Sequence, residues 1–337
     1  MSSKSKEKIQ INFVGEAASE VTGSCIWVKT PHVEFLIECG LYQSSGSTLS
    51  EYRINSAPFK FKPQNISYVF AAHCHGDHIL RIPLLFKRGM RAPVIMPEGS
   101  SAIARILMED SAHIMACDAA ALSKQYGREY LPIYEQEDVD LCMNNLQEYP
   151  MGKIIRLDDY VKFRFVPSGH ILNAAQIEIY VTEGNITKTI AYTSDLGNTH
   201  IKQYYISRFE PIQKANLLIG ETTYGGETRI ATQRTRNKDL EKLKSVIENT
   251  CQMNRGRVLI PCFANSRSQT ILSCLFEMFG DDPTFRVPIL FDTPMGIRIC
   301  EAYSKLLHGD ELNRWKRVLK WENIKFISDA SESKAWQ

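Results

Sequence analysis

The sequence His73-Cys74-His75-Gly76-Asp77-His78 is the stretch from which the fold and chemistry of this 337-residue chain are predicted most directly. It follows the almost wholly apolar run Ile66–Ala71, which is typical of a strand covered on both faces. Because residues two apart at the end of a strand point the same way, His73 and His75 can bind one metal ion. Asp77 and His78 follow on the turn and can reach a second ion. Imidazole and carboxylate donors suit zinc, with manganese and iron as alternatives. The competing interpretation is a polar loop that opens a helix, with Asp77 as its cap.

Two later segments can supply further ligands to such a pair of divalent ions. His170 lies in Pro-Ser-Gly-His-Ile-Leu, and Asp195 lies in Thr-Ser-Asp-Leu-Gly, each just after a predicted strand. A single histidine or aspartate in a loop is usually a turn or hydrogen-bonding residue. The position of both residues at strand ends, beside glycines and downstream of the histidine cluster, favours the metal site instead.

The spacing of apolar residues predicts an α/β protein. Near residue 222 the predicted pattern changes from mostly strands to helices that alternate with strands. In the first part we expect strands at Ile9–Val14, Cys25–Lys29, Glu34–Ile37, Ile66–Ala71, Ala92–Met96, Val161–Val166, Gln176–Val181, Thr187–Thr193 and Asn216–Ile219, with helices at Ile79–Phe86 and Ser100–Lys124. After it we expect helices at Lys238–Thr250, Ser268–Phe279 and Ile297–Leu307, alternating with strands at Arg257–Pro261, Val287–Phe291 and Ile324–Ile327. This change predicts one domain over residues 1–221 and a second over residues 222–337.

Amino-acid composition indicates the cellular compartment of the protein more clearly than its activity. The chain is 44% hydrophobic and 23% charged, with a net charge of +2, so any affinity for a polyanion must come from a local patch. Its nine cysteines are irregularly spaced and form no Cys-x-x-Cys pair, which favours reduced thiols. The polar, lysine-rich start and the lack of a long apolar run predict no membrane segment. We therefore expect a cytoplasmic protein, or a nuclear one in a eukaryote.

The order of these motifs is similar to that of the metallo-β-lactamase superfamily, whose fold is an αββα sandwich. By this resemblance, His73, His75 and His170 hold one ion, Asp77 and His78 hold the other, and Asp195 bridges them. Glu38 occupies the place where the family usually has an aspartate that supports the site from behind the ligands. The glutamate is one methylene longer, so its hydrogen bond to a ligand is expected to be shifted.

Later segments resemble the β-CASP nuclease branch of that superfamily, and the match covers nearly the whole chain. Gly220-Glu221-Thr222-Thr223-Tyr224-Gly225 is similar to the acidic motif that opens the β-CASP insertion. Three further segments resemble its other signatures, namely Leu131–Asp138, Arg257–Gln269 and Val287–Met295. The resemblance implies an inserted β-CASP α/β domain, here incomplete, and it assigns catalytic roles to Asp77, His170 and Glu221.

The resemblance also implies two C-terminal histidines, of which one works with Glu221 on the leaving group. No histidine follows His308 in this sequence. Two explanations are open: the chain is a fragment of a longer enzyme, or it is a reduced relative that binds metal but cuts poorly. Loss of a proton donor commonly costs about 10²–10⁴-fold in rate, so either explanation predicts low activity for this chain alone.

The function that these features imply is two-metal hydrolysis of phosphodiesters in nucleic acid, as in an RNA-processing ribonuclease such as ribonuclease J or the pre-mRNA cleavage endonuclease. Single-stranded RNA is the expected substrate, with DNA as the alternative, and the protein is expected to work as a homo-oligomer or within a processing complex. Two other functions stay open: a metal-binding partner subunit with little activity, and a small-molecule metallo-hydrolase. Candidates for phosphate contacts are Arg229, Arg234, Arg236, Lys238 and Arg267.

Overall fold

The computed structural model describes residues 8–197, 204–226 and 236–336, and its contacts divide the chain into two compact units. The first unit comprises Met1–Gly197 and Ser207–Thr223, and the second comprises Asn198–Ile206 and Tyr224–Gln337. The division after Thr223 lies close to the domain boundary predicted between residues 221 and 222. The boundary itself stays a prediction.

The first unit contains two sheets that face each other. The six-stranded sheet begins as an antiparallel meander and continues in parallel pairs, in the order β1 (Gln10–Phe13), β2 (Ile26–Lys29), β3 (Glu34–Ile37), β4 (Ile66–Phe70), β5 (Val94–Pro97) and β6 (Leu146–Tyr149). The order of the five-stranded sheet is β11 (Leu217–Ile219), β10 (Ile186–Tyr192), β9 (Ala175–Glu183), β8 (Val161–Pro167) and β7 (Ile155–Arg156). Its pairs are antiparallel except for β10 and β11, which are parallel.

The core of this unit lies between the two sheets, because alternate side chains of both point inward. Phe70 on β4 meets Phe163 on β8 with ring centroids 5.4 Å apart, and Phe163 also contacts Tyr149. Both phenylalanines are fully buried. Such an interior stabilises the pair of sheets as one body, since burying an aromatic side chain contributes about 1.5–3 kcal/mol.

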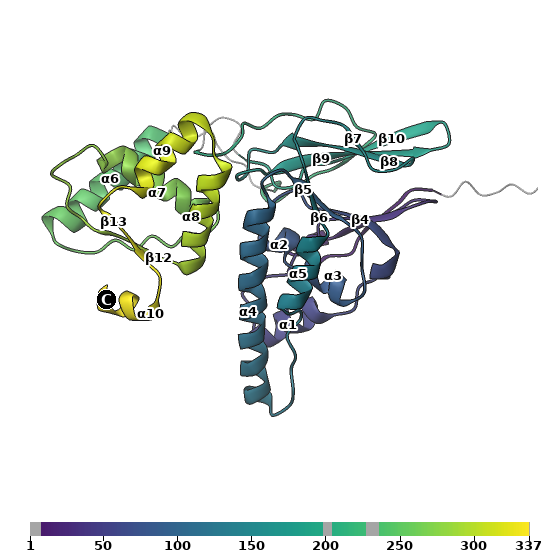
Figure 1. Ribbon diagram of the computed structural model, residues 1–337, viewed down its shortest axis with the longest axis horizontal. Helices are drawn as coiled ribbons and strands as arrows, with labels where there is room; N and C mark the ends of the chain where they lie inside the picture. The colour runs from purple at the N-terminus through teal and green to yellow at the C-terminus, as the bar shows by residue number, and fades with distance from the viewer. Residues whose placement is uncertain (1–7, 198–203, 227–235, 337) are drawn as a thin grey trace, which may run out of the picture. The chain divides into compact units, whose positions relative to one another are not determined.

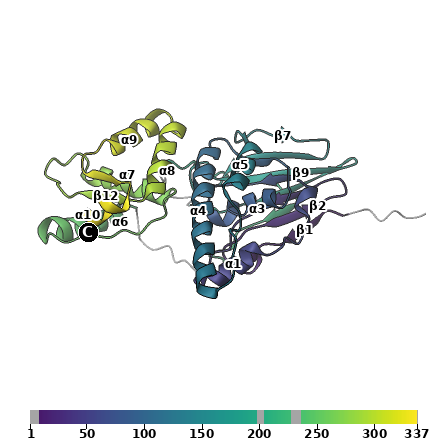
Figure 2. The same ribbon diagram turned by 60° about the horizontal axis from the view of Figure 1, so that its bottom comes forward.

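Helices cover the opposite face of the six-stranded sheet (Figures 1 and 2). They are α1 (Thr48–Ser56), α2 (Gly76–Ile79), α3 (Ile82–Lys87), α4 (Ser101–Tyr126) and α5 (Gln136–Asn144). Two of them show why they begin and end where they do. A capping box between Glu135 and Asp138 starts α5, and Gly127, at φ +64°, ends α4 in the left-handed conformation. The predicted α/β class is confirmed. No helix in the described part of the chain has both the length and the apolar character needed to cross a bilayer.

The second unit is a smaller α/β body. Its elements are α6 (Arg236–Ile247), a π-helical segment (Glu248–Met253), α7 (Arg267–Phe279), β12 (Ile289–Asp292), α8 (Pro294–Leu306), α9 (Gly309–Leu319), β13 (Ile324–Ile327) and α10 (Ala330–Trp336). The strands β12 and β13 are parallel. Phe279 and Phe285 stack at 4.0 Å in its core, and the fully buried Trp315 donates its indole N–H to the carbonyl of Cys300 at 3.1 Å.

The strand predicted at Arg257–Pro261 is not formed, and this prediction is wrong. Within the described residues, β12 and β13 pair only with each other, so this apolar segment has no neighbouring strand. Leu259 is 89% exposed and Phe263 is 80% exposed. Apolar periodicity reports which residues avoid water, but a strand also needs backbone partners, which a local pattern cannot supply.

Candidate metal centre

The candidate site lies where loops from both sheets of the first unit meet. His73 and His75 lie on the loop between β4 and α2, and His170 lies on the loop between β8 and β9. Asp195 follows the end of β10. Since β4 ends at Phe70, the two histidines come from a loop and not from the strand end that was expected, although their rings still meet.

Two glycines allow these loops to touch. A Cβ at Gly197 would lie 1.6 Å from the carbonyl oxygen of Gly169, and the N–H of Gly197 donates to the carbonyl of Ser168 at 3.0 Å. A Cβ at Gly40 would lie 1.7 Å from the carbonyl oxygen of Asp77. Any side chain at Gly197 would push apart the loops of His170 and Asp195, and any side chain at Gly40 would displace the segment of Asp77 and His78.

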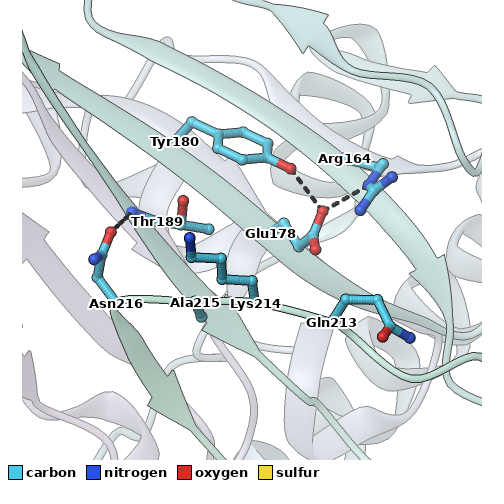
Figure 3. A pocket seen from close by; sticks show the side chains of 8 residues that line it. All are labelled: Arg164, Glu178, Tyr180, Thr189, Gln213, Lys214, Ala215 and Asn216. Carbon is cyan, nitrogen blue, oxygen red and sulfur yellow. Dashed lines mark hydrogen bonds and ion pairs between the residues drawn. The ribbon is translucent and has the colours of Figure 1, made fainter.

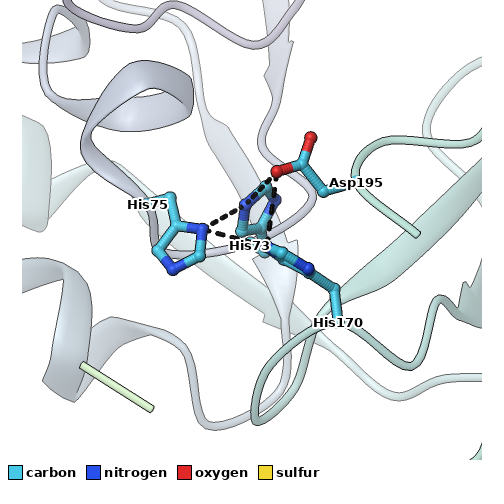
Figure 4. A group of neighbouring side chains, drawn as sticks. All are labelled: His73, His75, His170 and Asp195. Carbon is cyan, nitrogen blue, oxygen red and sulfur yellow. Dashed lines mark hydrogen bonds and ion pairs between the residues drawn. The ribbon is translucent and has the colours of Figure 1, made fainter. Parts of the chain in front are cut away.

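Four donor atoms converge in the first group, from His73, His75, His170 and Asp195 (Figure 4). Nδ1 of His75 lies 3.1 Å from Nε2 of His73 and 3.1 Å from Nε2 of His170. Oδ2 of Asp195 lies 3.3 Å from Nε2 of His170 and 3.8 Å from Nε2 of His73. Tetrahedral zinc, with bonds of about 2.0–2.1 Å, separates its ligand atoms by about 3.3–3.4 Å. The donor set therefore fits a divalent ion.

A second group of donors lies on the other side of Asp195. Oδ1 of Asp195 is 3.3 Å from Nε2 of His78, and Oδ2 of Asp77 is 3.6 Å from the same nitrogen. Asp195 thus presents one oxygen to each group, as a bridging ligand would. The structure brings together all six residues that were predicted as ligands, while the role of each one as a ligand stays a prediction.

Glu38 lies on the Nδ1 side of the His78 ring, whereas Asp77 and Asp195 lie on its Nε2 side. Its Oε1 is 3.5 Å from Nδ1 of His78 and accepts the backbone N–H of Ala72 at 3.1 Å. Glu38 and His78 also form a close trio with His73, but His78 turns its other nitrogen to Asp77 and Asp195. Glu38 is fully buried, and its φ of +62° is uncommon for a residue other than glycine. Its position suits a residue that orients His78.

Electrostatics in the metal-free chain keep two imidazoles neutral. Burial lowers the pKa of His73 well below its usual value, and burial together with the charge of His170 lowers the pKa of His75 to about 4. Burial would raise the pKa of Asp195, but the hydrogen bond with His78 outweighs it and lowers the pKa to about 2. Neutral imidazole and ionised carboxylate are the forms that bind metal.

The pKa of His78 is shifted in the opposite direction from those of His73 and His75. Burial tends to lower its pKa, but Asp195 and Glu38 outweigh burial and raise the pKa of His78 well above its usual value. The carboxylates therefore surround a position that attracts positive charge. A cation bound between Asp77, His78 and Asp195 would take the place of that proton.

Ser194 contacts the site and was not selected from the sequence. Its Oγ lies 3.1 Å from Nδ1 of His73. No sequence motif marks this serine apart from its position next to Asp195. Glu221, which the resemblance places in catalysis, accepts the backbone N–H of Leu196 at 2.7 Å through Oε1.

The predicted phosphate contacts that the structure describes, Arg236, Lys238 and Arg267, belong to the second unit. Arg229 and Arg234 lie outside the described residues. Arg267 is exposed at the first position of α7. Arg236 is bound by Glu277 at 2.6 Å and by the hydroxyl of Tyr204 at 2.7 Å, so its guanidinium is already engaged within the second unit.

A cavity of about 270 Å³ lies elsewhere, on the outer face of the five-stranded sheet (Figure 3). Three of its side chains bind each other: Nε of Arg164 donates to Oε2 of Glu178 at 2.6 Å, and the hydroxyl of Tyr180 donates to the same oxygen at 2.7 Å. None of the predicted metal ligands lines it. The histidine cluster is therefore the better candidate for chemistry.

Comparison with known proteins gives several relatives. The chain is 31% identical over 291 residues to ribonuclease TTHA0252 of Thermus thermophilus, a match that covers 86% of this chain and 60% of that protein. It is 27% identical to the transcription termination factor FttA of Methanocaldococcus jannaschii, covering 84% of this chain and 42% of the relative. It is 26% identical to Integrator complex subunit 11 of Danio rerio, covering 82% and 43%.

Two other comparisons add little to these relatives. A subclass B3 metallo-β-lactamase from a soil metagenome library aligns over 56% of this chain and 61% of its own, with 18% identity and a TM-score of 0.33. No family model matches the sequence.

Paired sheets with histidine and aspartate donors at their edge define an α/β protein that binds divalent metal. The relatives narrow this class: the chain belongs to the metallo-β-lactamase superfamily and, within it, to the β-CASP branch, as its motifs indicated. The chain spans 60% or less of the length of the three curated relatives named above.

Proposed function

We propose that this chain is a metal-dependent phosphodiester hydrolase that acts on nucleic acid, with RNA processing as its function. The observation that carries the proposal is the convergence of four donor atoms from His73, His75, His170 and Asp195, with ligand spacings that suit a divalent ion. The likeness to a ribonuclease over 86% of the chain supports phosphodiesters as the substrate class.

In this proposal the first ion is held by His73, His75, His170 and Asp195, and the second by Asp77, His78 and Asp195. The ions would be zinc, with manganese and iron as alternatives. Two divalent ions at such a site acidify a water molecule and stabilise the charge on phosphate oxygens. The protein's own contribution is to fix the donors: Glu38 supports His78, and the glycines at positions 40 and 197 let the ligand loops close.

Single-stranded RNA is the proposed substrate, and DNA is the alternative that the assay must exclude. Arg229, Arg234 and Arg267 are the proposed phosphate contacts, because a single strand is held mainly through its backbone charge. Two relatives bear the names of complex subunits, Integrator subunit 11 and a cleavage and polyadenylation factor subunit, which supports a place in a processing complex. We further propose a reducing, cytoplasmic or nuclear setting, since all nine cysteines are free thiols.

The test combines metal analysis with cleavage of labelled RNA and DNA by the same preparation. The wild-type chain should bind two equivalents of zinc and cut single-stranded RNA. His75→Ala should lose at least one equivalent and reduce cleavage at least about 100-fold, since even supporting residues cost about 10–100-fold at metal sites. His113→Ala is the matched control, because that histidine is exposed on α4 and should leave both readings unchanged.

A second candidate function is a metal-binding partner subunit that cuts weakly. The name of one relative, Integrator complex subunit 11, favours it in one respect, because that protein is a subunit of a complex. Zinc bound without cleavage of RNA or DNA would support this candidate over the nuclease. Turnover of a thioester or a lactam, without cleavage of nucleic acid, would instead support a small-molecule hydrolase.

A further inference from the structure

Ser194 makes a contact that links two predicted ligands. Its hydroxyl oxygen lies 3.1 Å from Nδ1 of His73, although 121 positions separate the two residues in the chain. Both side chains are about 99% buried, so water does not compete for this contact. The other ring nitrogen of His73, Nε2, is the atom that faces His75 and Asp195. The contact with Ser194 therefore lies on the side of the ring opposite to the donor group.

We propose that Ser194 is a positioning residue for the metal site, whose hydroxyl accepts the Nδ1–H of His73 and so leaves Nε2 free to bind the ion. A neutral histidine carries one ring proton, and the hydrogen bond made by one nitrogen decides which nitrogen is left as a ligand. This inference rests on the proposed function, because it assigns a role toward the metal that the proposed function requires.

The backbone at Ser194 supports a use for its side chain. Its φ is +51°, in the left-handed region that glycine adopts most readily. Glycine would fit this backbone with less strain but has no hydroxyl, so the serine hydroxyl comes with a cost in conformational free energy. The neighbouring hydrogen bonds hold the conformation: Thr193 donates its hydroxyl to the carbonyl of Ser194 at 2.8 Å and its N–H to the carbonyl of Ile219 at 2.9 Å.

The same loop carries Asp195, so the arrangement serves both ligands. Glu221 accepts the N–H of Leu196 and donates its own N–H to the hydroxyl of Thr193 at 3.1 Å. These bonds fix the loop on both sides of Asp195. A loop that places the carboxylate of Asp195 at the ion thereby also places the hydroxyl of Ser194 at His73.

The experiment measures zinc affinity by competition with a chromogenic chelator, in the whole chain and in two variants. Ser194→Ala removes the hydroxyl and keeps the left-handed backbone, while Ser194→Gly removes the hydroxyl and relieves the backbone. We expect both variants to bind zinc about 10–100-fold more weakly than the wild type. Metal-free Ser194→Gly should unfold at the wild-type temperature or above, which separates the metal effect from a loss of stability.

Ser168→Ala is the matched control. Ser168 is a buried serine two positions before His170, and its hydroxyl has no hydrogen-bond partner among the described residues. Its loss should leave zinc affinity unchanged. A second readout is the ¹⁵N chemical shifts of the His73 ring in the metal-free chain, which report the tautomer. They should show the Nδ1–H form in the wild type and a shift toward the Nε2–H form in both variants.

Wild-type zinc affinity in Ser194→Gly, or an unchanged His73 tautomer in both variants, would overturn the inference while leaving the proposed function standing. Failure of the wild-type chain itself to bind zinc would overturn the proposed function, and this inference with it. Ser194→Gly keeps the test decisive even where Ser194→Ala fails to fold, because glycine suits the backbone at this position.

Discussion

At the scale of single residues, Asp195 is the side chain on which both donor groups depend. One of its carboxylate oxygens faces His170 and the other faces His78. Asp195 can contact both donor groups only if its backbone stays fixed, because a carboxylate that turned toward one group would lose its contact with the other. Residues that hold this loop therefore matter as much as the ligands that bind the ions.

Glu221 is such a residue, and two substitutions separate its roles. Glu221→Gln keeps an oxygen that can accept the N–H of Leu196, so zinc affinity should stay within about twofold of the wild type. It removes the carboxylate that the resemblance places in leaving-group chemistry, so cleavage should fall by about 10²–10⁴-fold. Glu221→Ala should lower both, since the loop of Asp195 is then also released. Parallel zinc titration and RNA cleavage check this.

The contrary result for Glu221 would be informative. Wild-type cleavage by Glu221→Gln would show that the residue acts only by holding the loop. Weak zinc binding by Glu221→Gln, equal to that of Glu221→Ala, would contradict the loop-holding role, because glutamine keeps an oxygen that can accept the N–H of Leu196.

At the scale of elements, the site depends on loops that approach more closely than side chains permit. The loop after β10 lies against the loop between β8 and β9 through Gly197 and Gly169. The end of β3 lies against α2 through Gly40 and Asp77, where the N–H of Cys39 donates to the carbonyl of His78 at 2.9 Å. Backbone contact of this kind fixes ligand spacing without help from the ligands themselves.

Gly197→Ala tests this directly. Its Cβ would lie 1.6 Å from the carbonyl oxygen of Gly169, so the two loops must separate and carry Asp195 away from His170. We expect the free energy of unfolding to fall by about 1–3 kcal/mol or more, with weaker zinc binding. Chemical denaturation and chelator competition measure the two effects. Gly226→Ala is the control, since no described residue lies within 4 Å of its added Cβ, and equal effects of both changes would contradict the argument.

Sequence periodicity predicted most of the elements but not their partners. The strands Glu34–Ile37 and Ile324–Ile327 have the predicted bounds, and the predicted helix Ser100–Lys124 is Ser101–Tyr126. The helix α9 was missed because its apolar stripe of Leu312, Trp315, Val318 and Leu319 lies within a charged segment. The strand predicted at Arg257–Pro261 is absent because no strand of the described segments lies beside it.

The candidate site could be predicted only in part for a similar reason. Residue types and their order indicated the six donors, because the sequence alone shows which histidines and aspartates follow predicted strands. The contact of Ser194 with His73 depends on which atoms of two distant loops face each other. The left-handed backbone at Glu38 and Ser194 likewise arises from packing, since neither residue type favours it.

At the scale of the whole molecule, every predicted metal ligand belongs to the first unit. The six donors and Glu38 lie between positions 38 and 195, within Met1–Gly197. The second unit has its own interior, where Ile247, Leu275, Phe279 and Phe285 pack together. Metal binding should therefore stabilise one unit directly and leave the stability of the other to its own packing.

Chelation followed by hydrogen exchange tests this division. Ligand at 100 times its dissociation constant adds about 2.7 kcal/mol to the unfolding free energy of the body that binds it. Removing zinc should therefore speed amide exchange in the first unit, above all in α2, which contains Asp77 and His78, and at the end of β10, which precedes Asp195. Exchange in α7 and α8 should not change, because their amides are protected by the core of the second unit. In His75→Ala the chelator should have a smaller effect throughout the first unit. Equal loss of protection in α7 and α8 would instead mean that the two units unfold as one, so that the energy of the metal site is spread over the whole chain.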